Sequence, residues 1–157
     1  MKDQFHLNCG SVGKVVRMNQ MKLNPFDLLC YDFDGVMTDN RAYVMQDGRE
    51  TVVVNRSDGL AIAALRRAGV MQIIMSTEEN PVVSVRASKL NIPALQGLDD
   101  KAEALKAYNF ETGIDLARTA FIGNDVNDLS VMQLVGFPVA PSDACPSILN
   151  IAKHVTQ

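Results

Sequence analysis

The stretch that decides the fold runs Leu28-Leu29-Cys30-Tyr31-Asp32-Phe33-Asp34-Gly35. Its first four residues form a short apolar run, which is typical of a strand that is buried on both faces of a sheet. Two carboxylates follow at i and i+2 of an extended segment, so both point the same way. They would raise each other's pKa unless a cation lay between them. Oxygen ligands of this kind suit Mg²⁺, although an Asp-Gly turn with solvated acids explains the pattern equally well.

Strand and helix patterns alternate along the rest of the chain. The Asp47-Gly48 turn lies between two β-rich segments, 42–45 and 51–54, and predicts a hairpin. Strands that are separated by helices imply right-handed crossovers and a parallel sheet that is covered on both faces. The expected fold is therefore α/β, a three-layer, doubly wound, Rossmann-like parallel sheet with a β-hairpin insertion. The further strands are expected at 70–75, 92–95, 120–122 and 137–140, and the helices at 57–68, 80–90, 100–109 and 128–135.

Composition limits the classes of function. The chain has 157 residues, of which 47% are hydrophobic, enough for one domain with its own core. The net charge of -3 argues against a nucleic-acid partner. No apolar run reaches the ~20 residues that span a bilayer, and the first residues lack the apolar core typical of a signal peptide. The cysteines Cys9, Cys30 and Cys145 form no CxxC pair, which fits a cytoplasmic protein. Residues 1–25 are interpreted as an N-terminal extension, and 26–157 as the domain.

Polar side chains follow three further predicted strands. In parallel sheets ligands bind at the carboxyl ends of strands. Asp125 follows the strand 120–122 and is placed to complete a magnesium site opposite Asp32, whereas Asp128 either caps the next helix or holds a metal-bound water. Ser76 follows the strand 70–75 and offers a hydroxyl to a phosphoryl oxygen. Lys101 opens a helix, where it is either a solvated surface residue or a cation that neutralises phosphate and restrains Asp32.

In this order, Asp32-Phe33-Asp34-Gly35, Ser76, Lys101 and Gly123-Asn124-Asp125 through Asp128 closely resemble the four motifs of the haloacid dehalogenase superfamily of phosphatases. The interval between the first two motifs holds only the hairpin and one helix, so no cap domain is expected. The chain resembles the capless branch typified by 3-deoxy-D-manno-octulosonate (KDO) 8-phosphate phosphatase. Within that branch it is more similar to nonulosonate 9-phosphate phosphatases and to the phosphatase-like domain of some acylneuraminate cytidylyltransferases.

The resemblance implies a role for each motif residue. Asp32 is the nucleophile that becomes an aspartyl-phosphate, and Asp34 is the acid and then the base. Mg²⁺ is held by the carboxylates of Asp32 and Asp125 and by the main-chain carbonyl of Asp34. Ser76 and Lys101 hold phosphoryl oxygens, with Asn124 and Asp128 in supporting positions.

The expected substrate is a sugar-acid phosphate, with a nine-carbon 9-phosphate favoured over an eight-carbon 8-phosphate. The octulosonate enzymes usually carry Gly-Arg after the second motif, but here Glu78 follows Ser76-Thr77 and is suited to accept hydrogen bonds from hydroxyls or an amide. Arg86 and Lys89, three apart on one helix, either receive the sugar carboxylate or are two solvated basic residues.

The resemblance also implies a homotetramer in which the hairpin shields a neighbour's site. Tyr43, Val44, Val52 and Val54 give the hairpin apolar positions that a monomer does not easily bury. The alternative function is a non-catalytic oligomerisation domain linked to a cytidylyltransferase. A generalist sugar phosphatase is a second alternative, and a receiver domain is discounted because it lacks the DxDG pattern.

Overall fold

The structure is a computed structural model that describes residues 25–157. At its centre is a six-stranded sheet in the order β5-β4-β1-β6-β7-β8, in which every neighbouring pair is parallel. The strand order reverses beside β1, because the chain leaves it toward β4 and β5 and then returns to β6 on its other side. The strands are β1 (Leu28–Tyr31), β4 (Met71–Met75), β5 (Ala94–Leu95), β6 (Thr119–Ile122), β7 (Phe137–Ala140) and β8 (His154–Val155).

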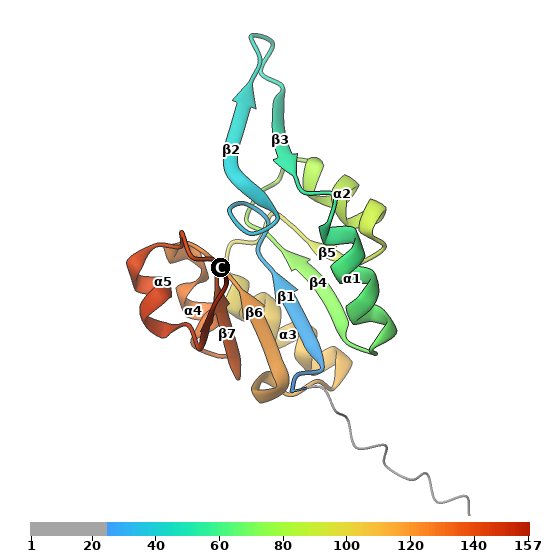
Figure 1. The fold of residues 1–157 in the computed structure, drawn as a ribbon, viewed down its shortest axis with the longest axis vertical. Helices are drawn as coiled ribbons and strands as arrows, with labels where there is room; N and C mark the ends of the chain where they lie inside the picture. The colour runs from blue at the N-terminus through green and yellow to red at the C-terminus, as the bar shows by residue number, and fades with distance from the viewer. Residues whose placement is uncertain (1–24) are drawn as a thin grey trace, which may run out of the picture.

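Helices cover both faces of this sheet (Figure 1). On one face α1 (Asp58–Arg67) and α2 (Val82–Leu90) pack against Leu29 and Tyr31 of β1. On the other face α3 (Lys101–Thr112), α4 (Leu129–Met132) and α5 (Pro146–Ile151) pack against Leu28 and Cys30. Alternate residues of β1 thus enter two separate cores, which explains its unbroken apolar run. The predicted three-layer α/β fold is confirmed.

The hairpin of β2 (Thr38–Val44) and β3 (Glu50–Val54) projects away from the sheet (Figure 1). Gly48 at its turn has φ +83°, a left-handed conformation that glycine adopts without strain. Between β1 and β4 the chain forms only this hairpin and α1, so no cap domain is inserted there.

Several predicted elements have different bounds in the structure. The first hairpin strand, expected at 42–45, is found at Thr38–Val44. Helix α3 continues to Thr112, where Gly113 ends it in a left-handed conformation. The strand expected at 92–95 is limited to Ala94–Leu95. The helix expected at 128–135 is wrong in extent: a 3₁₀ turn, η2 (Val126–Asp128), begins it under an Asp125 cap, and α4 ends at Met132. Sequence patterns also missed α5, β8 and the 3₁₀ turn η1 (Leu116–Arg118).

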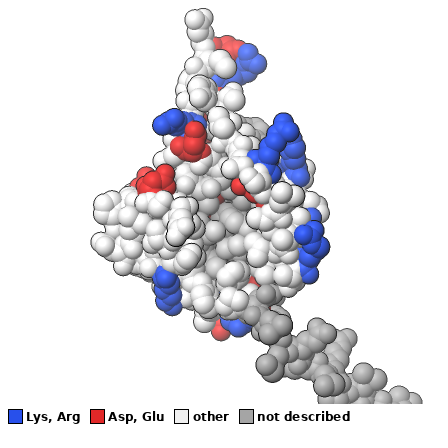
Figure 2. Space-filling model, in the orientation of Figure 1, with Lys and Arg blue, Asp and Glu red and all other residues white. Residues whose placement is uncertain are grey.

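The predicted extension at 1–25, with Cys9, lies outside the described residues except for Pro25. No helix within residues 25–157 combines the length and the hydropathy that a bilayer span requires. On the face shown in Figure 2, Lys and Arg side chains lie apart from one another and form no continuous basic patch among the described residues.

Candidate active site

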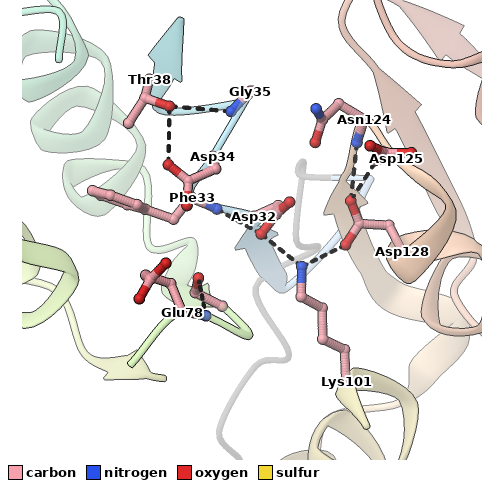
Figure 3. A network of polar contacts seen from close by, with 11 residues as sticks. Asp32, Phe33, Asp34, Gly35, Thr38, Glu78, Lys101, Asn124, Asp125 and Asp128 are labelled. Carbon is pink, nitrogen blue, oxygen red and sulfur yellow. Dashed lines mark hydrogen bonds and ion pairs between the residues drawn. The ribbon is translucent and has the colours of Figure 1, made fainter. Parts of the chain in front are cut away.

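A buried ion-pair network joins three of the predicted motifs (Figure 3). The Lys101 ammonium donates to Asp32 Oδ1 at 2.6 Å and to Asp128 Oδ1 at 2.7 Å. Asp100 caps α3 by accepting from the amides of Ala102 and Glu103, and this fixes Lys101 as the first residue of the helix. The Lys101 side chain is fully buried, so the solvated alternative is wrong.

One ammonium serves two carboxylates in this network, which leaves a negative charge uncompensated. Burial raises the pKa of the Asp32 carboxyl to about 7, and Asp128 adds to the rise while Lys101 opposes it. Asp32 Oδ1 also accepts from the Phe33 amide at 2.7 Å. With Oδ1 engaged by two donors, Oδ2 is the oxygen left to face the cavity.

The turn after Asp32 holds Asp34 beside it. The Thr38 hydroxyl donates to Asp34 Oδ1 and accepts from the Gly35 amide, both at 3.2 Å. Gly35 has φ +79°, and a Cβ there would overlap the Asn124 side chain, so this position requires glycine. Partial burial raises the pKa of Asp34, with a contribution from Glu78, while the Thr38 hydrogen bond lowers it.

The loop after β6 is organised by Asp128, which is fully buried. Its Oδ2 accepts from the Asn124 amide at 3.0 Å. A Cβ at Gly123 would lie 2.6 Å from Asp128 Cβ, so only glycine allows this approach. Asp128 therefore supports the loop and Lys101. Whether it also holds a metal-bound water stays a prediction.

Asn124, rather than Asp125, is the side chain that meets Asp32 and Asp34. One end of its amide lies 2.9 Å from the Asp34 main-chain oxygen and 3.2 Å from Asp32 Oδ2. If the nitrogen is turned toward them, it donates to both. If the oxygen is turned toward them, three oxygens face one point without a proton between them, which suits a divalent cation. The Asp125 carboxylate instead accepts from the Val126 amide at 2.7 Å.

With the Asn124 amide oxygen turned inward, the donor set at this point fits Mg²⁺, because it consists of oxygens alone: one carboxylate, one carbonyl and one amide. No three His, Cys, Asp or Glu side chains within residues 25–157 are grouped closely enough to hold a metal. A purely carboxylate site is therefore absent from this part of the chain. Asp125 still lines the same cavity, and a direct metal role for it stays a prediction.

Ser76 closes the opposite side of this cavity. It is buried at the end of β4, and its hydroxyl oxygen accepts from the Glu78 amide at 3.1 Å, which leaves the hydroxyl proton available to a ligand. The cavity has a volume of about 90 Å³. Its lining combines acids, amides and hydroxyls: Asp32, Asp34, Asn40, Ser76, Thr77, Asn124, Asp125 and Asn127.

Of the two alternatives for Arg86 and Lys89, a pair of solvated basic residues is wrong for Arg86. Its side chain is 9% exposed, and it donates to the Asn55 carbonyl at 2.6 Å and to Asp58 at 3.2 Å, whereas Lys89 is exposed. Helix α2 turns Arg86 toward α1, because its buried positions include Val83, Arg86, Ala87 and Leu90. Neither basic residue lines the cavity, and a carboxylate-binding role for them stays a prediction.

Comparison with known proteins identifies this arrangement. The family model of haloacid dehalogenase-like hydrolases matches residues 69–157. The chain belongs to the haloacid dehalogenase-like hydrolase family. The predicted family membership is thereby confirmed.

Curated relatives narrow the position of the chain within that family. It is 34% identical over 131 residues to a 3-deoxy-D-manno-octulosonate 8-phosphate phosphatase of Yersinia pestis, covering 83% of this chain and 70% of the relative. It is 31% identical over 129 residues to N-acylneuraminate cytidylyltransferase A of Danio rerio. There the match covers 81% of this chain but only 30% of the relative.

Solved structures agree with these relatives. A protein of Streptomyces avermitilis, described as a HAD family hydrolase, is 50% identical with a TM-score of 0.83 over 85% of this chain and 76% of that one. A 3-deoxy-D-manno-octulosonate 8-phosphate phosphatase of Moraxella catarrhalis, crystallised with magnesium, phosphate and KDO, is 30% identical with a TM-score of 0.82. That match covers 87% of this chain and 79% of the other. These likenesses confirm the prediction of an enzyme of the phosphatase type in a capless group of the family.

The sequence motifs of this haloacid dehalogenase-like protein did not identify every residue at the site. The Thr38 hydroxyl lies four residues beyond Asp34, and that spacing within a turn was the available signal. Asn40 also lines the cavity, and its backbone has φ +61°. This conformation depends on how the two hairpin strands pair, so the sequence alone did not predict it.

Proposed function

We propose that the chain is a Mg²⁺-dependent phosphomonoesterase that acts on a sugar-acid phosphate through an aspartyl-phosphate on Asp32. The observation that carries this proposal is the position of Asp32. One of its oxygens is held by Lys101 and by the Phe33 amide, while the carboxylate lines a polar cavity with Ser76 and Asn124. Phosphoryl transfer asks mainly for positioning and charge neutralisation. This arrangement provides the positioning, and a bound divalent cation would complete the neutralisation.

In the first step an Asp32 oxygen bonds to phosphorus, and the bond from phosphorus to the sugar oxygen breaks. Asp34 gives its proton to the leaving oxygen, and partial burial, which raises the pKa of Asp34, favours this role. In the second step Asp34, now ionised, takes a proton from the water that attacks phosphorus, and phosphate leaves Asp32. The Lys101 ammonium and the Ser76 hydroxyl balance the charge on the phosphoryl oxygens.

The residues that would hold the metal are Asp32 through its carboxylate, Asp34 through its carbonyl and Asn124 through its amide oxygen. Bound Mg²⁺ supplies charge that neutralises the carboxylate pair and the phosphoryl group. The magnesium of the Moraxella catarrhalis phosphatase supports this choice of ion. Asp125, predicted as a ligand, remains the alternative to Asn124.

The substrate class is inferred from relatives and from the lining of the site. The relatives from Yersinia pestis and Moraxella catarrhalis are named for an eight-carbon sugar-acid 8-phosphate. Glu78 lines a second cavity that also includes Asp34, so it is positioned to accept hydrogen bonds from a sugar. We therefore infer either that ester or a nine-carbon nonulosonate 9-phosphate as the substrate.

The proposed working form is a homotetramer in the cytoplasm. The hairpin exposes 57% of Tyr43 and 66% of Val44, and a second subunit would cover these side chains. The likeness to the zebrafish cytidylyltransferase motivates a functional link to such an enzyme. The non-catalytic alternative has no support in the site, because Asp32, Asp34 and Lys101 are all in place.

The test is phosphate release by the full chain with and without Mg²⁺, from sugar-acid phosphates and from p-nitrophenyl phosphate. Turnover is expected to require Mg²⁺ and to fall at least about 10³-fold in Asp32→Asn. Asp143→Asn is the matched control, because Asp143 is exposed and does not line the cavity. Full activity of Asp32→Asn, or an inactive wild-type chain with Mg²⁺, would overturn the proposal.

A further inference from the structure

A second cavity adjoins the one that contains Asp32. It has a volume of about 260 Å³, and it shares Asp34 and Asn40 with the smaller, 90 Å³ cavity. The smaller cavity has about a third of the volume of the second. With the phosphoryl group in the smaller cavity, the rest of a larger substrate would extend past Asp34 and Asn40. The second cavity lies in that direction.

The base of the hairpin supplies one wall of this second cavity. The pairing of β2 with β3 is irregular between Thr38 and Ala42, and Asn40 in this interval has φ +61°. Here two backbone amides donate to side-chain oxygens of the same strand. The Asn40 amide donates to Thr38 Oγ1, and the Arg41 amide donates to Asp39 Oδ1. Irregularities of this kind redirect side chains beside active sites, and here Asn40 and Arg41 line the cavity.

The charges of the second cavity are unequal. Asp34, Glu50 and Glu78 contribute three carboxylates, and Arg41 contributes the one guanidinium. Neither cavity is lined by any other Lys, Arg or His among the described residues. Lys101 lies behind Asp32 and is already shared between two carboxylates. A substrate that carries a carboxylate as well as a phosphate would meet mainly like charge there.

Arg41 is available to an external anion. Within residues 25–157 no hydrogen bond or ion pair engages its guanidinium, although three carboxylates line the same cavity. By contrast, Arg49 on the same hairpin pairs with Asp47 at 2.8 Å, and Arg86 is held by Asp58. A guanidinium presents two parallel N–H donors that match a carboxylate.

We propose that Arg41 is the specificity-determining residue that binds the substrate's carboxylate in the second cavity, while the phosphoryl group lies between Asp32 and Ser76. The inference rests on the proposed phosphatase function and deepens it. It also assigns the sugar carboxylate to a residue beside Asp34 in place of Arg86 and Lys89. In this arrangement Glu78 accepts hydrogen bonds from hydroxyls of the intervening sugar chain.

The test compares esters with and without a carboxylate. For Arg41→Ala, kcat/KM on 3-deoxy-octulosonate 8-phosphate or a nonulosonate 9-phosphate is expected to fall about 10- to 100-fold, the range for one charged hydrogen-bonded pair. The loss should appear in KM more than in kcat, because Arg41 lies away from the reacting atoms. Turnover of p-nitrophenyl phosphate, which has no carboxylate, should stay within about twofold.

Two variants serve as controls. Arg41→Lys keeps the charge but loses the paired donors, so it should recover part of the lost affinity for the sugar acid. Arg49→Ala removes the same side chain from the hairpin tip, where it lines neither cavity, and should leave both substrates unaffected.

The outcomes separate the two proposals. If the wild-type chain hydrolyses p-nitrophenyl phosphate and a sugar-acid phosphate but Arg41→Ala weakens both equally, or neither, the assignment of Arg41 is wrong and the phosphatase function stands. If the wild-type chain hydrolyses neither, the proposed function itself fails. Activity on p-nitrophenyl phosphate with none on sugar acids overturns the substrate class and the assignment of Arg41 together.

Discussion

The central sheet and the hairpin use their side chains in opposite ways. All four residues of β1 and four of the five in β4 are buried, whereas in β2 Thr38 is the single buried residue and in β3 there is none. Each buried apolar side chain of the sheet stabilises the fold by roughly 1.5–3 kcal/mol, so the reacting residues stand on a rigid base. The hairpin gains little of this stabilisation within one chain. Its side chains remain available for contact with substrate and with other subunits.

The central sheet and the hairpin therefore have different proposed roles. The residues proposed to break and form bonds come from the ends of β1, β4 and β6 and from the first residue of α3. Residues proposed to select the substrate and to join subunits come from the hairpin. Substitutions in the first group should alter chemistry and stability together, while those in the second should leave the fold intact.

The largest effect on stability is expected from a substitution of Lys101, whose buried ammonium pairs with Asp32 and Asp128 beside the sheet. Lys101→Met leaves Asp32 and Asp128 buried without their cation, so the free energy of unfolding should fall by about 3 kcal/mol or more at neutral pH. The cost should shrink near pH 5, since burial raises the pKa of Asp32 and its carboxyl then binds a proton. Urea unfolding measures both values.

Lys106→Met is the control for this substitution. Lys106 lies on the same helix but is exposed and paired with Glu103, so unfolding should not change. Equal stability of the Lys101→Met and Lys106→Met proteins would show that the buried network does not support the sheet.

In the hairpin, we expect a change of assembly without a change of fold. Replacing Tyr43 and Val44 together by serine removes two exposed apolar side chains, and the proposed tetramer should dissociate to particles about a quarter of its mass. Light scattering measures the mass, and circular dichroism checks that the fold persists. Leu60→Ser changes an equally exposed leucine on α1 and should have no effect on mass. A wild-type monomer would contradict the proposed assembly.

A smaller effect should follow from the pKa of Asp32. Since burial raises that pKa to about 7 before metal binds, a proton competes with Mg²⁺ at lower pH. Apparent Mg²⁺ affinity, measured by calorimetry, should therefore weaken about tenfold from pH 8 to pH 6. An affinity that is constant over this range would mean that Asp32 is ionised throughout.

The same shift affects stability with a defined sign. The pKa of Asp32 is about 7 when folded against 3.8 as the reference value, so folding takes up a proton between these limits. In metal-free protein this group's contribution to the free energy of unfolding is present below about pH 4 and is lost as the pH rises through 7. Asp32→Asn should remove that pH dependence.

The smallest change concerns the identity of the metal ligand. Asn124→Asp adds a carboxylate next to Asp32 and Asp34, and Mg²⁺ should bind several-fold more tightly, up to about tenfold, with some loss of stability in metal-free protein. Asp125→Asn should have less effect on Mg²⁺ affinity, which calorimetry reports independently of turnover. The reverse order of effects would identify Asp125 as the ligand and Asn124 as a loop residue.

Strand-end motifs correctly predicted which residues the sheet brings together, because these motifs are local. Asp32, Ser76 and Asp128 each lie at a fixed distance along the chain from a buried strand, and the ends of parallel strands meet at one edge. Lys101 was correctly placed for a related reason, since its helix begins at a capping aspartate. The bounds of η2 and α4 were less predictable, because a side-chain cap in the loop decided them.

The side chains proposed to contact the substrate and the metal were harder to predict, because their directions depend on how helices, turns and the hairpin pack against one another. Spacing places Arg86 and Lys89 three residues apart on a helix, but the packing of α2 against α1 decides which one is buried. Spacing likewise suggests Asp125 for the metal, and the structure adds Asn124 as a second candidate, because Asn124 meets Asp32 while an Asp125 oxygen accepts from the Val126 amide. The irregular pairing at the base of the hairpin is what brings Arg41 to the cavity.

By itself, the sequence determined the parallel sheet, the capless architecture and the edge at which the acids gather. It did so because strands that are buried on both faces require continuous apolar sequence. Polar and charged residues follow such a strand where the chain leaves the core and reaches solvent. Tertiary structure alone decided that Asn124 faces Asp32 and that Arg86 is buried against α1. It also decided that Arg41 lines the second cavity. These outcomes follow from packing between segments distant in the chain, and no local pattern of residues records that packing.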